Sequence, residues 1–149
     1  MAKAQSPLVT DPVRSALMGR VRQNGTTPEL AVAGALRDLG LSYRKNVRSL
    51  PGAPDFANRR RRWAVFVNGC YWHHHSCGRG TTPVRNREFW AAKFVANRLR
   101  DATAIRSLRR QGFRVVVIWE CQSRDPVTMR KRLSAIPGAR QVSSGSQTA

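Results

Sequence analysis

The feature that most constrains the fold is the uninterrupted apolar run Trp63–Val67. A run without alternating polar residues is typical of a strand that is buried on both faces of a sheet. A similar run, from Phe113 to Trp119, follows after a long segment with helical spacing. Buried strands need helices on both faces to cover them. The sequence therefore predicts an α/β fold with a mixed central sheet flanked by helices.

Capping residues and glycines predict where the other elements begin and end. Asp11-Pro12 is typical of a helix start, and Gly40 is typical of a helix end. We expect helices over residues 11–25, 26–40, 84–111 and 126–133, and strands over residues 41–47, 55–57, 63–67 and 113–119. Together they predict a flexible lead at residues 1–10, one domain at 11–136 and a disordered Ser/Gly/Gln-rich tail at 137–149.

The charge balance indicates the kind of partner. Lys and Arg number 27 against eight Asp and Glu, which gives a net charge of +19. Such a field attracts polyanions, with nucleic acid as the first candidate and an anionic membrane surface as the second. Most of these cations are arginines, whose planar fork suits phosphate. A basic protein with no specific partner is the weaker alternative.

The sequence also indicates a location. No 18 consecutive residues are apolar, and residues 1–7 are too polar for a secretory signal. We therefore expect an intracellular protein, cytoplasmic and associated with the nucleoid.

Cysteine and histidine are concentrated in one segment. Five of the six such residues lie within Cys70–Cys77, and the sixth is Cys121, just after the last predicted strand. Structural zinc prefers four tetrahedral N and S ligands, which Cys70, one of the histidines, Cys77 and Cys121 could supply. The alternative is that Cys121 is a plain core cysteine and the histidines form an accidental run. A second histidine of the run could act as a general base.

A carboxylate is expected near the end of the first buried strand. Asp55 begins a short strand that precedes Trp63–Val67 by one basic turn. Nuclease chemistry uses a carboxylate to hold Mg²⁺ at the scissile phosphate. Glu29, in the first turn of the second helix, could add an outer carboxylate. The alternatives are that Asp55 is a turn residue and that Glu29 only complements the helix dipole.

Four segments together resemble one known family. They are Pro-Gly-Ala-Pro-Asp-Phe at 51–56, Val-Phe-Val-Asn-Gly-Cys-Tyr-Trp-His-His-His at 65–75, Asn-Arg-Glu-Phe-Trp at 86–90 and Val-Ile-Trp-Glu-Cys at 117–121. They resemble the very short patch repair endonucleases over about residues 15–133. The resemblance implies a restriction-endonuclease-like (PD-(D/E)XK-type) core that nicks duplex DNA 5′ to the T of a T:G mismatch.

The resemblance also implies roles for particular residues. Asp55 and the carbonyl of Val67 resemble the magnesium ligands, and His73 resembles the general base. Glu29 and Asp101 resemble supporting carboxylates. Cys70, His75, Cys77 and Cys121 resemble the ligands of a structural zinc ion.

Contacts with DNA are implied in the same way. Tyr71, Trp72 and Trp90 resemble an aromatic wedge inserted at the mismatch, and Met18 resembles the residue that enters from the opposite groove. Lys93 and Asn97 lie where the family contacts the mismatched bases. A wedge discriminates because unstacking costs least at a mismatch. Trp90 alone would also fit an ordinary core position on a helix.

The chain departs from the family pattern next to the predicted site. The family typically has Thr-His where Val67-Asn68 stands. A backbone ligand survives the change at Val67, but Asn68 replaces a histidine that contacts the cleaved phosphate. The change leaves open a related nicking or restriction-type endonuclease with another target.

Beyond the reaction itself, the resemblance implies a monomer that works with mismatch-repair proteins and a DNA polymerase. An alternative of another class is a zinc-stabilised DNA-binding module without catalysis.

Overall fold

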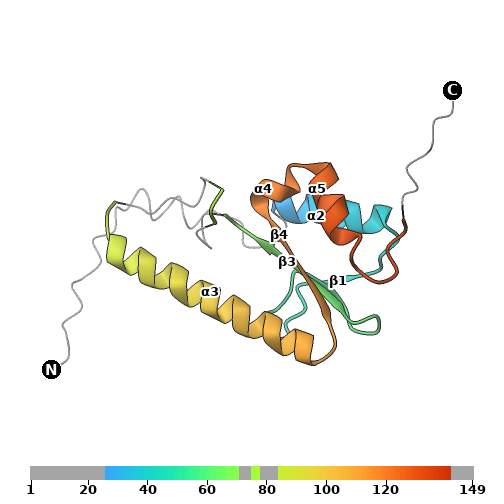
Figure 1. Cartoon of the computed structure of the whole chain (residues 1–149), viewed down its shortest axis with the longest axis horizontal. Helices are drawn as coiled ribbons and strands as arrows, with labels where there is room; N and C mark the ends of the chain where they lie inside the picture. The colour runs from blue at the N-terminus through green and yellow to red at the C-terminus, as the bar shows by residue number, and fades with distance from the viewer. Residues whose placement is uncertain (1–25, 71–74, 78–83, 142–149) are drawn as a thin grey trace.

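A computed structural model describes residues 26–70, 75–77 and 84–141 of the 149-residue chain. In chain order its elements are α2 (Thr27–Asp38), β1 (Arg44–Lys45), β2 (Phe56–Asn58), β3 (Trp63–Asn68), α3 (Arg87–Arg110), β4 (Arg114–Trp119), α4 (Glu120–Ser123) and α5 (Pro126–Leu133). They form a sheet with the long helix α3 on one side and the helices α2, α4 and α5 on the other (Figure 1).

The sheet is mixed, as the sequence predicts. Its four strands lie in the order β1-β2-β3-β4. The first three are antiparallel neighbours, whereas β3 and β4 are parallel and pair from Trp63 with Arg114 to Asn68 with Trp119. A parallel pair needs a long crossover connection, and α3 lies within that connection. Both predicted buried strands are therefore confirmed, and they are adjacent.

Alternate side chains of β3 pack on opposite faces of the sheet. Trp63 and Val65 join a core with α2 and α5, while Ala64 and Phe66 join a second core on the other face. The first core is the larger and contains Leu36, which is fully buried. Because both faces are covered, the strand contains no polar residue before its end.

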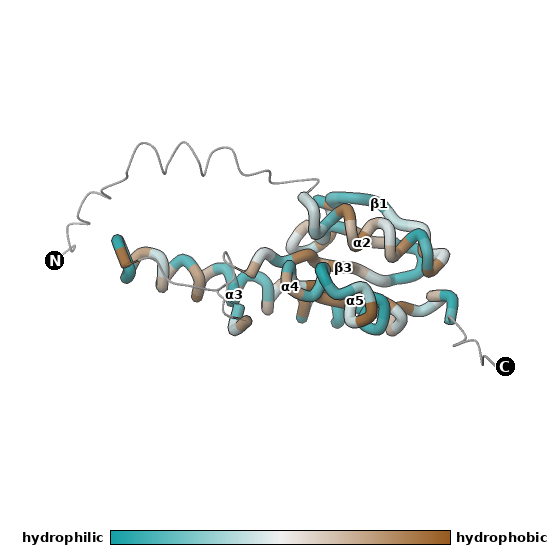
Figure 2. Tube along the Cα trace, turned by 90° about the horizontal axis from the view of Figure 1, so that it is seen from above, coloured by the Kyte–Doolittle hydropathy of each residue, from teal (hydrophilic) through white to brown (hydrophobic). Residues whose placement is uncertain are grey.

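The second core is built by the last turns of α3. Leu108 is fully buried there. The earlier turns of the helix carry exposed apolar side chains, such as Val95 and Leu99, and in Figure 2 the α3 tube mixes hydrophobic and hydrophilic segments. Only Phe94, Ala104 and Leu108 are buried in this helix. The sheet therefore anchors α3 by its C-terminal end, and most of its early surface is exposed.

Some boundaries differ from the predicted ones. The strand predicted at 41–47 is reduced to two paired residues, because Asn46 takes a left-handed backbone conformation with φ of 49° and turns the chain. The sequence predicts disorder from residue 137, whereas the Arg140 N–H donates to the Leu39 carbonyl at 2.9 Å and holds this segment against the end of α2. The helix α4 is not predicted from the sequence. The predicted helix 11–25 lies outside the described residues.

Within the described residues, no helix combines the length and apolar character needed to cross a bilayer.

Candidate metal centre and active site

The ends of β3 and β4 bring distant chemical groups together. The strands are parallel, so their C-terminal residues, Asn68 and Trp119, are neighbours. Cys70 and Cys121 each follow two residues later. In an α/β sheet, the carboxyl ends of parallel strands are the usual place for a functional site.

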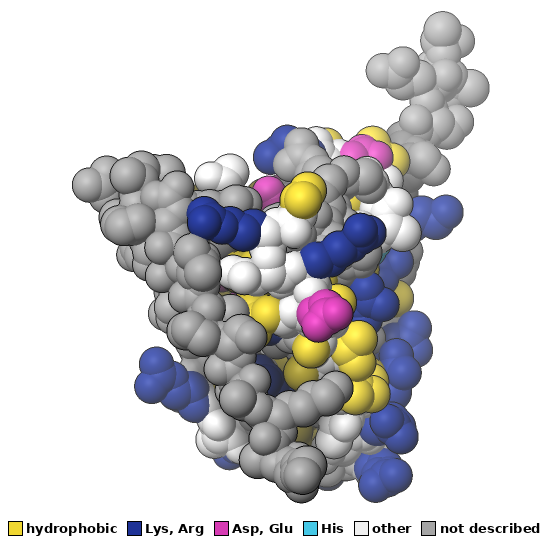
Figure 3. All heavy atoms as spheres, turned by 90° about the vertical axis from the view of Figure 1, so that its left-hand side faces the viewer, with side chains coloured by type: hydrophobic (Ala, Val, Ile, Leu, Met, Phe, Trp, Pro, Cys, Tyr) yellow, Lys and Arg dark blue, Asp and Glu magenta, His cyan; other side chains and the backbone are white. Residues whose placement is uncertain are grey.

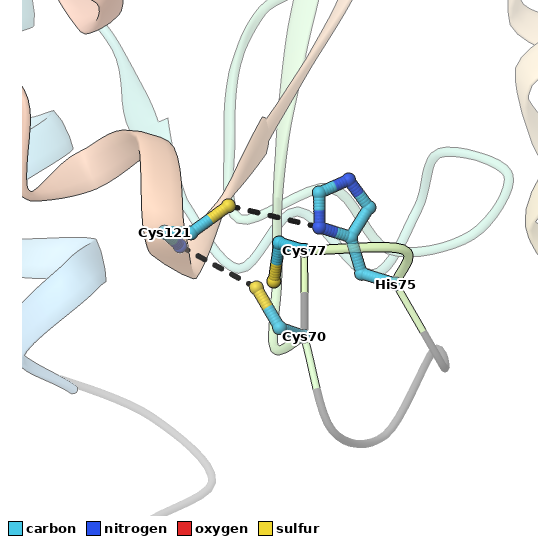
Figure 4. A group of neighbouring side chains, drawn as sticks. All are labelled: Cys70, His75, Cys77 and Cys121. Carbon is cyan, nitrogen blue, oxygen red and sulfur yellow. Dashed lines mark hydrogen bonds between the residues drawn. The ribbon is translucent and has the colours of Figure 1, made fainter. Parts of the chain in front are cut away.

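Four predicted ligands converge at this edge. The ligand atoms of Cys70, His75, Cys77 and Cys121 all lie within 4.8 Å of one another. Figure 4 shows the loop residues facing Cys121, which comes from α4. Two of these residues are also joined through the backbone, because the His75 N–H donates to the Cys70 carbonyl at 2.9 Å. The three cysteines form no disulfide, so the cluster could hold a metal ion.

The surroundings of the cluster disfavour an uncompensated thiolate. Cys70 is fully buried, and burial raises the pKa of its thiol to about 12. A thiolate at that position therefore needs a nearby positive charge, such as a metal ion. The His75 ring stacks on Trp119 with 4.1 Å between ring centroids, which orients Nδ1 3.6 Å from the Cys121 sulfur. No role for Trp119 is predicted from the sequence, although its position two residues before Cys121 is a usable signal.

Asp55 lies at the same edge of the sheet. It precedes β2, whose first residue, Phe56, pairs with Val65, so Asp55 lies beside the last residues of β3. The Val67 N–H donates to Oδ2 of Asp55 at 2.7 Å. The Asp55 carbonyl accepts from the Asn46 N–H at 3.0 Å, which fixes the backbone. The structure thus brings together the two residues predicted to hold magnesium.

The predicted residues of α3 share one side of that helix. Trp90, Asn97 and Asp101 are half-buried and are spaced at seven and four residues, in line with the buried Phe94. Lys93 is exposed, and its ammonium lies 5.4 Å from the Trp90 ring centroid. Trp90 also lies near the Phe94 ring, which agrees in part with the alternative that Trp90 occupies a core position on the helix.

The other predicted residues have different positions. Glu29 is half-buried in the first turn of α2, and Asn68 is half-buried at the end of β3. Four predicted residues lie outside the described ranges: Met18, Tyr71, Trp72 and His73.

The exposed surface near the beginning of α3 is mixed. Figure 3 faces that side of the molecule and shows several Lys and Arg side chains, mainly along one side, with hydrophobic side chains and an acidic group between them. The hydrophobic side chains include the exposed Phe89, Val95 and Leu99.

Comparison with known proteins adds independent information. The family described as "DNA mismatch endonuclease Vsr" matches residues 7–79. The type II nicking enzyme V.XorIIP of Xanthomonas oryzae pv. oryzae is 39% identical over 123 residues, which cover 83% of this chain and 90% of the relative. The type II nicking enzyme V.NmeAIP of Neisseria meningitidis serogroup A is 35% identical over 129 residues, 87% of this chain and 92% of the relative.

A third relative has a different kind of name. The DNA mismatch endonuclease Vsr of Escherichia coli is 39% identical over 111 residues, 74% of this chain and 71% of the relative. The α/β fold, the edge site and these matches together define a DNA endonuclease. The chain belongs to the Vsr family of DNA mismatch endonucleases.

Proposed function

We propose that this endonuclease nicks one strand of duplex DNA 5′ to the T of a T:G mismatch, by magnesium-assisted hydrolysis on a restriction-endonuclease-like core. The observation that carries the proposal is the contact between Asp55 and Val67 at the carboxyl edge of the sheet, 2.7 Å from backbone nitrogen to carboxylate oxygen. The family membership supplies the reaction class.

Asp55 and the Val67 carbonyl would hold the magnesium ion. The backbone hydrogen bond fixes the orientation of the Asp55 carboxylate, and oxygen donors of this kind suit a hard cation that keeps most of its water ligands. When bound, the ion stabilises charge on the phosphate and on the leaving 3′ oxygen. Position 73 carries the histidine that takes a proton from the attacking water, and Glu29 and Asp101 support the water network.

The Cys/His cluster would hold zinc in a structural role. Bonds of ~2.3 Å to sulfur and ~2.0 Å to nitrogen place tetrahedral S and N ligands about 3.5 Å apart. The Cys121 sulfur and Nδ1 of His75 are 3.6 Å apart, close to this spacing, and all four ligand atoms lie within 4.8 Å of one another. The ion would join the loop after β3 to α4 and thereby fix the backbone beside Asp55.

Recognition of the mismatch would come from aromatic side chains and α3. Tyr71, Trp72 and Trp90 would unstack the base step from one groove, and Met18 would enter from the other. Lys93 and Asn97 would contact the exposed base edges, because they lie on the same early part of α3 as Trp90. We expect the enzyme to act as a monomer, in the cytoplasm at the nucleoid, alongside mismatch-repair proteins and a DNA polymerase.

The decisive assay is strand-specific nicking of a labelled T:G duplex beside its T:A counterpart in Mg²⁺. We expect one cut, 5′ to the mismatched T, and little cutting of T:A. Equal cutting of both duplexes would reject mismatch specificity, and a preference for another mismatch would favour the related-endonuclease alternative. Binding without cleavage in any divalent metal would favour the DNA-binding module.

Asn68 calls for a separate variant in the same assay because it replaces the histidine typical of the family. Asn68→His should raise the nicking rate if the missing imidazole limits contact with the cleaved phosphate. An unchanged rate would mean that Asn68 supplies the contact itself.

A further inference from the structure

The N-terminal ends of β3 and β4 form a second concentration of charge, at the opposite edge of the sheet from Asp55. We define the basic end as Arg59–Arg62, at the β2–β3 turn, together with Arg109 and Arg114. All six side chains are exposed. The Arg114 N–H donates to the Arg62 carbonyl at 2.8 Å, which ties the turn to the start of β4.

The ion pairs identified among the described residues do not join an acid to the basic end. Within the described part of the chain, Arg124 pairs with Glu120 and Arg130 pairs with Asp38, and neither of these ion pairs involves the basic end. Instead, Nη1 of Arg62 donates to the Gln111 carbonyl at 3.3 Å, and Arg59 donates to the Ser49 hydroxyl at 2.7 Å. These neutral partners position the guanidinium groups and leave their net charge uncompensated.

Two glycines make room for the arginines. A Cβ on Gly138 would lie 2.6 Å from Nη1 of Arg61, and a Cβ on Gly112 would lie 3.1 Å from Nη1 of Arg62. Arg62 itself has a φ of 54°, a conformation that Gly or Asn adopts with less strain. Arg62 therefore adds to the positive charge at this end of the sheet at some cost in backbone strain.

Two open grooves are lined in part by arginines of the basic end. One, of about 670 Å³, is lined by Arg109, Gly112–Val116 and Arg132. The other, of about 370 Å³, lies beside β1 and is lined in part by Arg44 and Arg59–Arg60. Neither lining includes an Asp or Glu among the described residues. The basic end thus extends from the β2–β3 turn to the start of β4, about 10 Å at a strand spacing of ~4.8 Å.

We propose that the basic end is a second DNA-binding surface, which holds duplex phosphates away from the nicking site. Six residues of β3 separate the two ends, about 20 Å at ~3.3 Å per residue. Arginine forks match phosphate oxygens. A membrane is the poorer partner, because in the described part of the chain the exposed large apolar residues lie outside the basic end: Leu30, Val84, Phe89, Val95, Leu99 and Val127. The phosphates belong either to the flanks of the nicked duplex or to a second duplex.

The test compares two triple variants with the same net charge. Arg59→Ser/Arg60→Ser/Arg114→Ser removes charge from the basic end, and Arg37→Ser/Arg124→Ser/Lys131→Ser removes it elsewhere. On a fully paired duplex of about 40 base pairs, we expect the first variant to lose about tenfold in affinity. The slope of log K against log salt should fall by up to about 3, at ~0.9 per lost phosphate contact. The control should change affinity less than about threefold. Equal losses in the two variants would overturn the proposal.

Further arms separate the sources of phosphate. A T:G duplex that extends only about five base pairs (~17 Å) on each side of the mismatch does not span the ~20 Å to the basic end. The first variant should nick this short duplex at the wild-type single-turnover rate. A lower rate would place the substituted arginines at the nicking site and overturn the proposal. In a further assay, the protein is bound to an immobilised duplex and a second, labelled duplex is added. Capture of the labelled duplex would mean that the basic end binds a second duplex. No capture, together with the affinity loss on the long duplex, would mean that the basic end binds the flanks of the nicked duplex.

Two controls distinguish charge from folding, and DNA from a membrane. Lysine at the same three positions should restore most of the affinity, because charge is retained; failure of this rescue with a native melting temperature would contradict phosphate binding. Vesicles of phosphatidylglycerol serve as the membrane probe, and a basic-end effect on vesicles but not on DNA would overturn the proposal. Because the paired duplex has no mismatch, this test remains valid even if T:G specificity fails.

Discussion

The two ends of the β3–β4 pair have opposite chemistry. At the C-terminal ends lie Asp55 and the thiol and imidazole ligands, while at the N-terminal ends lie six exposed arginines. The strands between them are apolar and buried. One rigid element therefore separates a site that can hold metal ions from a surface that can only attract anions.

The comparison shows where the few acidic residues of this basic chain lie. Several carboxylates near the C-terminal end have identified local partners. Asp55 accepts from Val67, Asp125 caps α5, and Glu120 lies 3.7 Å from Arg124. In contrast, the basic end has no acid in its grooves among the described residues. Charge is thus separated along the strands, which keeps phosphate attraction from being weakened by carboxylates.

The largest expected effect tests the metal role of the C-terminal end. Asp55→Ala should reduce single-turnover nicking at least about a thousandfold, because a metal supplies several kcal/mol to the transition state. Affinity for the T:G duplex, measured without divalent metal, should change little. Asp125→Asn, at the start of α5, is the matched control and should nick normally. Loss of binding in Asp55→Ala would instead make Asp55 a structural residue.

The next effect tests the Cys/His cluster. Cys121→Ser should lower bound zinc, measured by elemental analysis, from about one equivalent to a small fraction. It should also lower the unfolding free energy by more than about 3 kcal/mol, since metal affinity contributes directly to stability. Ser76→Ala, in the same loop but outside the donor set, should alter neither. Full stability without zinc would show that packing alone holds the loop.

A smaller effect of opposite sign is expected at the basic end. Arg62→Asn should raise the unfolding free energy by roughly 0.5 kcal/mol, because Asn tolerates the left-handed conformation and like-charge repulsion is reduced. Arg60→Asn, at a position without a positive φ, should give less gain. Denaturant titration measures both variants. A large loss in Arg62→Asn would mean that the Gln111 contact stabilises the fold.

The smallest expected effect is a pH-dependent contribution of Asp125 to stability. The Thr128 hydroxyl and the Val127 N–H donate to Asp125, and these hydrogen bonds lower the pKa of its carboxyl group. A lowered folded-state pKa contributes stability above the unfolded pKa of ~3.9 that is lost as pH falls through the folded value. The melting-temperature difference between wild type and Asp125→Asn should therefore shrink in acid. A constant difference from pH 7 to pH 2 would contradict this.

Much of the fold can be predicted because its signals are local. The apolar run at Trp63 predicts the buried strand, and Asp125-Pro126 predicts the start of α5. The two-residue strand β1 and the four-residue helix α4 lack such signals. Trp119 and Glu120 join strand to helix directly, stabilised by the Gln122 side chain, which accepts from the Trp119 N–H at 3.0 Å.

The candidate site is predictable by composition more than by geometry. The cluster of Cys70 with Cys121 follows from residue type and strand ends. The hydrogen bond from Val67 to Asp55 depends on strand register, which the four arginines between β2 and β3 do not specify by themselves. The side chain of Asn58 accepts from the Arg61 N–H at 2.9 Å and shapes that turn. The stacking of Trp119 on His75 likewise requires the loop and strand to be placed in space.

The proposed mechanism depends most on Asp55 and the Val67 carbonyl holding the cation that drives nicking. Anomalous diffraction from crystals of the protein with a T:G duplex and Mn²⁺ would locate that cation. We expect a peak about 2.2 Å from an Asp55 carboxylate oxygen and from the Val67 carbonyl oxygen, beside the scissile phosphate. A cation bound at that phosphate by other residues, with Asp55 bonded only to the Val67 N–H, would contradict the mechanism.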